Sequence, residues 1–434
     1  MKFSLLIPEI TLFSGALLIL MLDVFFNKKN EKFQFFAHFF ALIICGIALA
    51  FAVKTFGSYE TAFNDMINSR ALISFIKCIV IALLTFIILI SIRYIFTIEK
   101  YSSEYLALLM IATVGGLLMI SANDLLLFYL GLELQALSLY LLASFNVKSA
   151  KSSEAGIKYF ILGSLASGIL LFGISMVYGF SGTTNLTLIK DLIEKTKPDE
   201  IPVGLIFGLI MVITAMLFKI SSAPFHMWAP DVYQGAPSAV LAFFGTVVKF
   251  STVMALLLLS YSANWQILSK IFLLAFSSIG HIGFVLLALC SMQKYSYISA
   301  ILYMIIYSII SLGTFAFLTI IRSPQTHEND ATDDKIFNIN SLAGLAKTNP
   351  TLALSLSILM FSSAGIPPLA GFFSKFYIIK TAILTGLLPY AIIAVIFSAV
   401  SAFYYLRIVK IMYFDQPNAH IEIEDFGNSR LVII

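Results

Sequence analysis

The sequence contains unusually little charge for its length. Only 12% of its 434 residues are Asp, Glu, Lys or Arg, whereas soluble domains contain about 25%. Apolar residues make up 60% of the chain. The net charge of +4 is small and dispersed, which argues against a nucleic-acid partner. This composition excludes an ordinary soluble domain and predicts a polytopic membrane protein embedded in a lipid bilayer.

Cysteine is also scarce, with 3 residues that lie far apart in apolar stretches. They form no CxxC pair, no ferredoxin-like spacing and no disulfide framework. The chain also lacks a GxGxxG turn and a GxxxxGK[ST] loop, so no nucleotide site is visible. We therefore expect no cofactor and no metal on this chain. Cys45, Cys78 and Cys290 are interpreted as small buried hydrophobic residues.

Long apolar stretches dominate the sequence and predict an all-α membrane helical bundle. A spanning helix needs about 20 apolar residues, and the alternating segments of a membrane β-barrel are absent. The stretches that qualify are Phe3–Phe26, Phe33–Val53, Ala71–Phe96, Tyr105–Ser121, Asp124–Phe145, Ile157–Phe180, Val203–Ser221, Ser238–Ser260, Trp265–Cys290, Ile298–Ile321, Thr351–Leu388 with a break, and Tyr390–Phe414. The first is interpreted as a retained span, because its apolar core is too long for a signal peptide.

Proline interrupts two apolar regions. The first, FKISSAPFHMWAPDVYQGAPS, contains Pro224, Pro230 and Pro237, and the second, FSSAGIPPLAGFFSKFYIIK, contains Pro367 and Pro368. Proline removes a helical hydrogen bond, so both regions predict broken helices. Broken backbone is tolerated at membrane depth only where protein or a wet cavity surrounds it. The similar breaks indicate inverted repeats with a transport path at the breaks.

Two charged residues lie near the middle of apolar stretches. Lys249 is the central residue of Ser238–Ser260, where an ammonium costs about 2.5–3.5 kcal/mol on insertion scales. Such a residue is by default part of an ion or proton pathway. Glu133 lies within Asp124–Phe145 and is expected to titrate or to pair with a buried lysine. A structural helix–helix ion pair is the alternative for Glu133.

Four further residues extend this proposed path. Lys219 precedes the first break and Lys375 follows the second, with snorkelling to water as the alternative for Lys219. His226 is expected to relay a proton from Lys219 to Lys249, although a structural histidine is the alternative. A metal-binding role is disfavoured, because no second ligand lies three or four residues away. His281, in SSIGHIGF, is a weaker relay candidate.

Lysine suits a proton relay because its ammonium releases a proton more readily once it is removed from water, whereas arginine stays charged. A nearby carboxylate holds the proton on the lysine, and moving the carboxylate away releases it. Lys77 and Lys158 lie near span ends, where snorkelling is the leading explanation. His38 has no motif around it and is interpreted as structural. Three further residues could support water wires: Tyr129, Ser138 and Tyr140. Aromatic and small polar residues are, however, common in helix bundles.

A family resemblance rests on five motifs. They are LELQALSLYLL, EAGIKYFILGSLASGILLFG, KISSAPFHMWAPDVYQGAPS, SSIGHIGF and AGIPPLAGFFSKFYI. These motifs resemble the antiporter-like subunits of bacterial respiratory complex I, the proton-translocating NADH–quinone oxidoreductase. The resemblance covers nearly the whole chain, and a lysine at 375 is typical of the N-type subunit.

The resemblance implies roles, partners and location. It implies that Glu133 pairs with Lys219, that Lys249 is a central-axis lysine, and that Lys375 ends the second half-channel. NADH, FMN, iron–sulfur clusters and quinone are expected in other subunits of the complex. The implied partners are neighbouring antiporter-like and small membrane subunits, and the implied location is the bacterial inner membrane.

The resemblance also predicts a domain organisation. Residues 1–100 are expected to form a three-span bundle, 101–262 a first antiporter-like repeat and 263–414 a second one. The second repeat is expected to be short by one span, because only eleven residues separate Trp265 from SSIGHIGF. Residues 415–434 are expected to form a tail or the start of a truncated last span.

We predict that the chain translocates protons across the membrane. This translocation would be coupled to electron transfer from NADH to quinone in other subunits. Two alternatives remain at this point. The chain could belong to a multisubunit Na⁺/H⁺ antiporter, which shares broken helices and lysines, or it could be a non-pumping structural membrane subunit.

Overall fold

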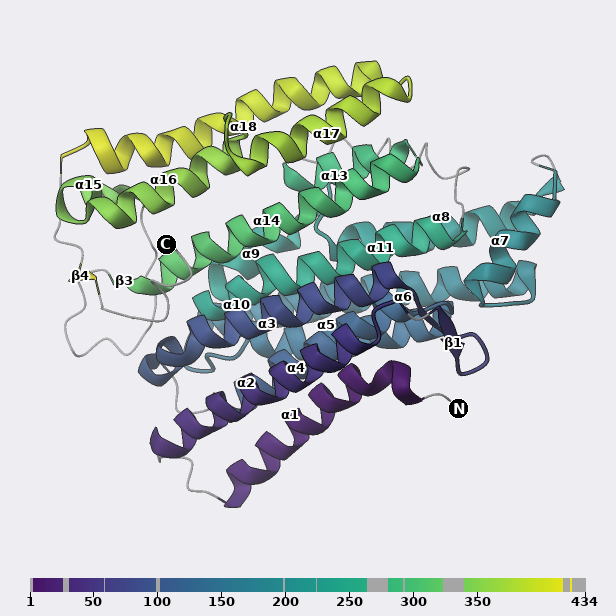
Figure 1. Ribbon diagram of the computed structural model, residues 1–434, viewed down its shortest axis with the longest axis horizontal. Coiled ribbons are helices and arrows are strands. Elements are labelled where there is room, and N and C mark those ends of the chain that lie inside the picture. Colours follow the sequence, from purple (N-terminus) through teal and green to yellow (C-terminus); the bar gives the residue numbers. More distant parts are fainter. Residues whose placement is uncertain are drawn as a thin grey trace. The chain divides into compact units, whose positions relative to one another are not determined.

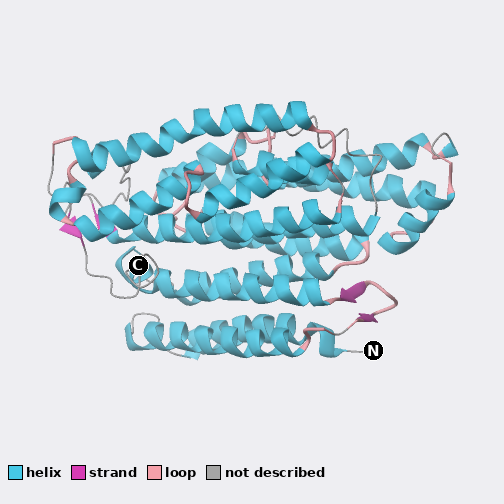
Figure 2. Ribbon diagram, turned by 45° about the horizontal axis from the view of Figure 1, so that its top comes forward, coloured by secondary structure: helices cyan, strands magenta, loops and turns pink. Residues whose placement is uncertain are grey.

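A computed structural model describes residues 3–25, 31–57, 59–98, 102–197, 200–223, 225–263, 280–291, 293–322, 339–416 and 422–423. Helices make up almost all of this described part, and the strands form two short antiparallel pairs (Figure 2). The strands are β1 (Glu60–Ala62), β2 (Ile67–Ser69), β3 (Ile321–Arg322) and β4 (Glu422–Ile423). In the first pair Glu60 lies opposite Ser69, and in the second Ile321 lies opposite Ile423.

The helices follow one another along the chain (Figure 1). They are η1 (Phe3–Leu6), α1 (Ile7–Phe25), α2 (Glu31–Lys54), α3 (Ala71–Ile98), α4 (Ser102–Ser121), α5 (Leu125–Ala143), α6 (Ala150–Ser181), α7 (Leu186–Lys195), α8 (Val203–Lys219), α9 (Trp228–Gly235), α10 (Ser238–Phe243), η3 (Phe244–Val248), α11 (Lys249–Ala263), α13 (His281–Cys290), α14 (Lys294–Ile320), η5 (Ile339–Leu342), α15 (Leu345–Thr348), α16 (Pro350–Ala364), α17 (Ala370–Leu384) and α18 (Leu388–Phe414).

Nine candidate membrane spans lie in the described residues, judged by helix length and composition. They coincide with nine of the predicted stretches, which confirms an all-α, polytopic membrane bundle. Two other stretches form shorter apolar helices, α8 and the pair α16 and α17. The stretch Trp265–Cys290 is described only in its last part, α13, and residues 264–279, including Trp265, lie outside the described residues.

Both predicted helix breaks are present. The first separates α8 from α9, and Ser221 in this break has a φ of 57°, in the left-handed region. The second separates α16 from α17, which follow one another in Figure 1. It begins at Gly365, whose φ of 87° is in the left-handed region that ends many helices. Pro224 lies outside the described residues.

The chain divides into two compact units, Met1–Ile88 with Glu99–Ile271, and Leu89–Ile98 with Phe272–Ile434. In the first unit, the continuous span from α10 to α11 is the most deeply buried of the candidate spans, since 89% of its apolar 18-residue segment lies inside the protein. In the second, α16 packs through Leu352, Leu356 and Met360 against Ile411 and Met412 of α18. The predicted division into an N-terminal bundle and two repeats stays a prediction.

Close backbone contact fixes α8 against α6 in the first unit. A Cβ added to Gly173 would lie 2.8 Å from the Gly208 carbonyl oxygen, and a Cβ added to Gly208 would lie 2.9 Å from that of Gly173. Small residues let membrane helices approach in this way, where there is little hydrophobic force to drive association. This crossing sets the position of α8 and therefore of Lys219 at its end.

A buried ion pair links the first and third spans. Lys77 Nζ lies 2.6 Å from Glu9 Oε1, and the two side chains are 6% and 4% exposed. The snorkelling explanation for Lys77 is therefore wrong, because α1 supplies a buried carboxylate at the depth of the lysine. Lys158 is 42% exposed, as expected for a snorkelling side chain, and it contacts Asp231 at 2.7 Å.

Neutralising one member of the Glu9–Lys77 pair is expected to destabilise the protein more than neutralising both. Glu9→Gln or Lys77→Met leaves an uncompensated buried charge, which typically costs about 3–5 kcal/mol. The double variant should recover much of this loss. Thermal unfolding of the purified complex measures the effect, and Lys197→Met, which removes an exposed ion pair with Glu200, is the matched control. Equal and additive losses from the two substitutions would contradict the prediction.

Candidate functional site

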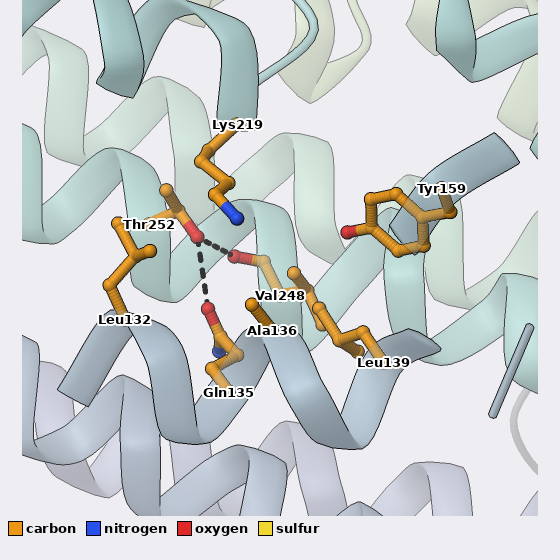
Figure 3. Close-up of a pocket in the computed structure, with 8 residues that line it drawn as sticks. All are labelled: Leu132, Gln135, Ala136, Leu139, Tyr159, Lys219, Val248 and Thr252. Carbon is orange, nitrogen blue, oxygen red and sulfur yellow. Dashed lines mark hydrogen bonds between the residues drawn. The ribbon is translucent and has the colours of Figure 1, made fainter. Parts of the chain in front are cut away.

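Lys219 ends α8 at the first break, where the last turn of a helix favours a positive charge. Its Nζ donates a hydrogen bond of 3.2 Å to the Tyr140 hydroxyl oxygen of α5. The same ammonium lies 5.6 Å from the centre of the Tyr140 ring. The side chain is half-buried, and its ammonium points toward the pocket that the other labelled residues line (Figure 3).

An aromatic column holds the first break in place. Trp228, at the start of α9, stacks on Tyr159 with ring centres 4.6 Å apart. Its indole nitrogen donates to the Phe218 carbonyl oxygen at 3.1 Å, which satisfies one of the carbonyls left open at the end of α8. Tyr159 in turn meets Tyr140 edge to face at 4.9 Å. The break is thus a packed structure that fixes the backbone on both sides of Lys219.

A small internal cavity lies in front of the Lys219 ammonium (Figure 3). Two of its polar lining residues are Gln135 of α5 and Thr252 of α11, which are 3% and 4% exposed. Thr252 Oγ1 lies 3.3 Å from Gln135 Oε1 and 2.8 Å from the Val248 carbonyl oxygen. The cavity is close to the smallest size that holds one water molecule among polar partners.

Glu133 lies on α5, two residues before Gln135, and is half-buried. It forms no ion pair with Lys219 in the part of the chain that the structure describes, and its buried Oε1 has no hydrogen-bond partner there. An unpartnered buried carboxylate oxygen is costly, and such groups call for an explanation. The pairing of Glu133 with Lys219 remains a prediction for another conformation.

Lys249 is the first residue of α11 and directly follows the π-helical turn η3. Turns of this kind are rare and occur frequently at functional sites. The Lys249 ammonium lies 5.5 Å from the centre of the Tyr233 ring of α9. Val248 and Thr252, on either side of Lys249 along the chain, line the cavity that Lys219 faces. The structure therefore brings the helical segment of Lys249 to the same cavity as Lys219.

His226 lies within the first break, between α8 and α9. Its Nδ1 atom is buried without a hydrogen-bond partner among the described residues. The ring is thus able to accept or donate a further hydrogen bond, but no bond of His226 to Lys219 or Lys249 is present in the described structure. Its relay role stays a prediction.

Lys375, on α17, is 7% exposed and reaches back to the end of α16. Its Nζ donates to the carbonyl oxygens of Ser363 at 2.9 Å and Ala364 at 3.0 Å, and to Ser398 Oγ at 3.1 Å. A Cβ added to Gly365 would lie 3.2 Å from this Nζ. The ammonium therefore satisfies carbonyls that the broken helix leaves open, at the negative end of its dipole.

His281 lies at the start of α13, and both of its ring nitrogens contact tyrosine hydroxyls. Nδ1 lies 2.6 Å from Tyr303 Oη and Nε2 lies 2.9 Å from Tyr405 Oη. His281 and Lys375 line one small cavity of the second unit, together with Tyr303 and Tyr307. A histidine bound on both sides is suited to passing a proton between two hydroxyls.

Comparison with known proteins agrees with this architecture. The profile of the family "NADH:quinone oxidoreductase/Mrp antiporter, TM" matches residues 122–273 and 250–403. The chain belongs to this family. It is 38% identical over 440 residues to NADH-quinone oxidoreductase subunit N of Paramagnetospirillum magneticum, and the alignment covers 95% of this chain and 88% of that one.

Two solved structures share the fold of this family member. One is a chain of respiratory complex I from Thermus thermophilus with bound aureothin, with a TM-score of 0.75 and 24% identity, covering 98% of this chain and 96% of that one. The other is a chain of the Mrp complex from Dietzia sp. DQ12-45-1b, with a TM-score of 0.77 and 19% identity, covering 96% of this chain and 82% of that one. At these identities the similarity shows the fold alone.

Sequence reasoning missed two contacts of the site. Gln135 was part of the quoted LELQAL motif, but nothing marked it as a partner of Thr252, 117 residues away. Tyr140 was one of several possible water-wire residues, without any sign that it binds Lys219. Residue spacing offered a partial signal, since Gln135 and Tyr140 lie near Glu133 on one helix.

Proposed function

We propose that this chain carries protons across the membrane through Glu133, Lys219, Lys249 and Lys375, as an antiporter-like membrane subunit of the NADH–quinone oxidoreductase. The main support is the cavity in the first unit. Lys219 faces it directly, and the helical segment that begins with Lys249 forms one of its walls. A water molecule there would connect donors and acceptors on both sides.

The chain is a multi-pass protein of the bacterial inner membrane, and its partners are the other membrane subunits of the complex. The curated relative from Paramagnetospirillum magneticum is named NADH-quinone oxidoreductase subunit N, and its alignment covers 95% of this chain. The chain is an enzyme subunit in the sense that the complex is a proton-translocating oxidoreductase. NADH, FMN, iron–sulfur clusters and quinone are bound by other subunits.

The proposed cycle begins with Glu133. When Glu133 approaches Lys219, the carboxylate holds a proton on the lysine, and when it withdraws the desolvated ammonium releases the proton. The released proton passes through water in the cavity beside Thr252, or through His226, to Lys249. In the second unit, Lys375 and His281 share a cavity and carry the proton onward.

The free energy available from a lysine–carboxylate switch matches the free energy needed to move one proton across the membrane. Moving one elementary charge across 100 mV is worth about 2.3 kcal/mol. A change of two pKa units corresponds to about 2.7 kcal/mol, since each unit is 1.36 kcal/mol. Breaking one close lysine–carboxylate contact in a buried setting is of this size or larger.

Sodium–proton exchange is the second candidate function, because the name of the family includes the Mrp antiporter and one structural neighbour is a chain of an Mrp complex. The structural neighbour is 19% identical, whereas the curated subunit N relative is 38% identical. The two functions differ in a simple way: pumping by an oxidoreductase subunit requires NADH and does not require sodium. A non-pumping structural subunit would show neither dependence.

Lys249→Ala in the assembled complex tests the proposed function. We expect a roughly tenfold loss of protons pumped per NADH oxidised, since a positioned proton-transfer group contributes at least that much to a rate. Pumping is measured in proteoliposomes with a pH-sensitive dye, in sodium-free buffer. Lys197→Ala, at an 81% exposed position, is the control and should pump normally. Wild-type pumping by Lys249→Ala at normal quinone reduction would exclude the proposed path.

A further inference from the structure

We infer that Tyr140 is a positioning residue that holds the Lys219 ammonium in a position away from Glu133, and that Gly163 provides the space for its hydroxyl. Lys219 would then have two alternative acceptors, the Tyr140 hydroxyl and the Glu133 carboxylate, and proton release would follow transfer of the ammonium from the Glu133 carboxylate to the neutral Tyr140 hydroxyl. The inference rests on the proposed function, because it assigns a resting position to a lysine of the proposed path.

Tyr140 binds the Lys219 ammonium. In the described part of the chain, its Nζ makes one hydrogen bond, the 3.2 Å bond to Tyr140 Oη. The ring of the same tyrosine lies 5.6 Å from the ammonium, within the range of a cation–π interaction. Tyr140 therefore supplies the hydrogen bond and the ring contact that the structure gives to this charge, whereas the Glu133 carboxylate attracts it only through a longer-range Coulomb interaction.

Two acceptors for this ammonium lie along α5. Glu133 and Tyr140 are seven residues apart, so they lie on one face of the helix with about 10.5 Å of rise between them. The ammonium lies at the Tyr140 end, and Glu133 Oε1 has no hydrogen-bond partner among the described residues. One lysine thus has an occupied acceptor at one end of this face and an unused one at the other.

Packing against α6 fixes the position of the Tyr140 side chain. Its ring is held edge to face by Tyr159 at 4.9 Å and by Phe160 at 5.6 Å, both on α6. Its hydroxyl lies against the backbone of Gly163, where an added Cβ would collide with the oxygen. Any larger residue at 163 would displace the hydroxyl that binds Lys219. Gly168, five residues further along α6, has no atom within 4 Å of an added Cβ.

Tyr140→Phe is the direct test, because it removes the hydroxyl and keeps the ring and its packing. We expect protons pumped per NADH oxidised to fall about threefold to tenfold at neutral pH. A hydrogen bond accepted from an ammonium favours the charged lysine, so its loss should move the alkaline limb of the pumping profile about 0.5–1 pH unit lower. A purely structural role would lower the amount of assembled complex without moving this profile.

Gly163→Ala supplies a second, independent test, with Gly168→Ala as its matched control on the same helix. Gly163→Ala should reproduce the loss and the shift seen in Tyr140→Phe, and Gly168→Ala should resemble wild type. Tyr178→Phe, which removes an exposed hydroxyl from α6, is the control for loss of a tyrosine oxygen. All values are normalised to assembled complex, measured by native gel electrophoresis.

Lys219→Ala separates this inference from the proposed function. If Lys219→Ala abolishes pumping while Tyr140→Phe and Gly163→Ala pump with the wild-type pH profile, the positioning role is wrong and the path stands. If Lys219→Ala pumps normally, the proposed path fails and the inference fails with it. If either Tyr140→Phe or Gly163→Ala fails to assemble, the other decides by the same criterion, since one deletes the hydroxyl and the other displaces it.

Discussion

Glu133→Gln is expected to reduce proton pumping by roughly 100-fold in a complex that remains as stable as wild type. Glutamine has nearly the same shape but cannot take up or release the proton, and a positioned proton-transfer group contributes roughly 10²–10⁴-fold to a rate. Stability should not fall, because the buried Glu133 Oε1 has no hydrogen-bond partner in the described residues. A neutral amide at this place costs less to bury than a carboxylate.

A loss of pumping without a loss of stability distinguishes a proton-transfer role of Glu133 from a structural one. It is measured by dye-monitored pumping in proteoliposomes and by thermal unfolding of the same preparation. Glu154→Gln, at a 60% exposed position on α6, is the control and should change neither quantity by much. Glu133→Asp keeps a titratable group and should retain part of the pumping. Loss of stability together with pumping would instead indicate a structural ion pair, the alternative considered from the sequence.

The helical architecture was predictable because membrane spans depend on a local property. A run of about 20 apolar residues is visible without knowledge of neighbouring helices, and nine such runs coincide with long helices. The breaks were equally local, since proline and glycine prevent continuation of α8 and α16. The π-helical turn before Lys249 was not predictable, because nothing in FGTVVK distinguishes it from an ordinary helix.

The charged residues of the site were found from the sequence because burying charge in a membrane is costly wherever it occurs. Their partners were not found, because partners come from distant positions. Lys77 near a span end suggested snorkelling, but Glu9, which lies 68 positions earlier in the chain, is 2.6 Å from it. In the same way, Tyr140 is one of 19 tyrosines, and only the fold shows that its hydroxyl contacts Lys219.

Lys375 should give different results when replaced by arginine and by methionine. Its Nζ donates to Ser363 O, Ala364 O and Ser398 Oγ, and so completes the end of α16. Methionine removes all three donors, and each buried carbonyl left without a partner costs about 1–3 kcal/mol. We therefore expect Lys375→Met to lose much of the assembled complex, as measured by native gel electrophoresis and by NADH oxidation in membranes.

Lys375→Arg keeps a positive charge with several N–H donors at the second break, but a guanidinium does not release its proton. We expect this variant to assemble and to reduce quinone, while the protons pumped per NADH fall roughly 100-fold. Lys380→Arg, one turn and a half further along α17, is the matched control and should pump normally. If Lys375→Arg pumps as well as wild type, Lys375 acts only as a cap for the broken helix. If Lys375→Met assembles fully, the capping role is excluded instead, because the carbonyls of α16 then need no ammonium.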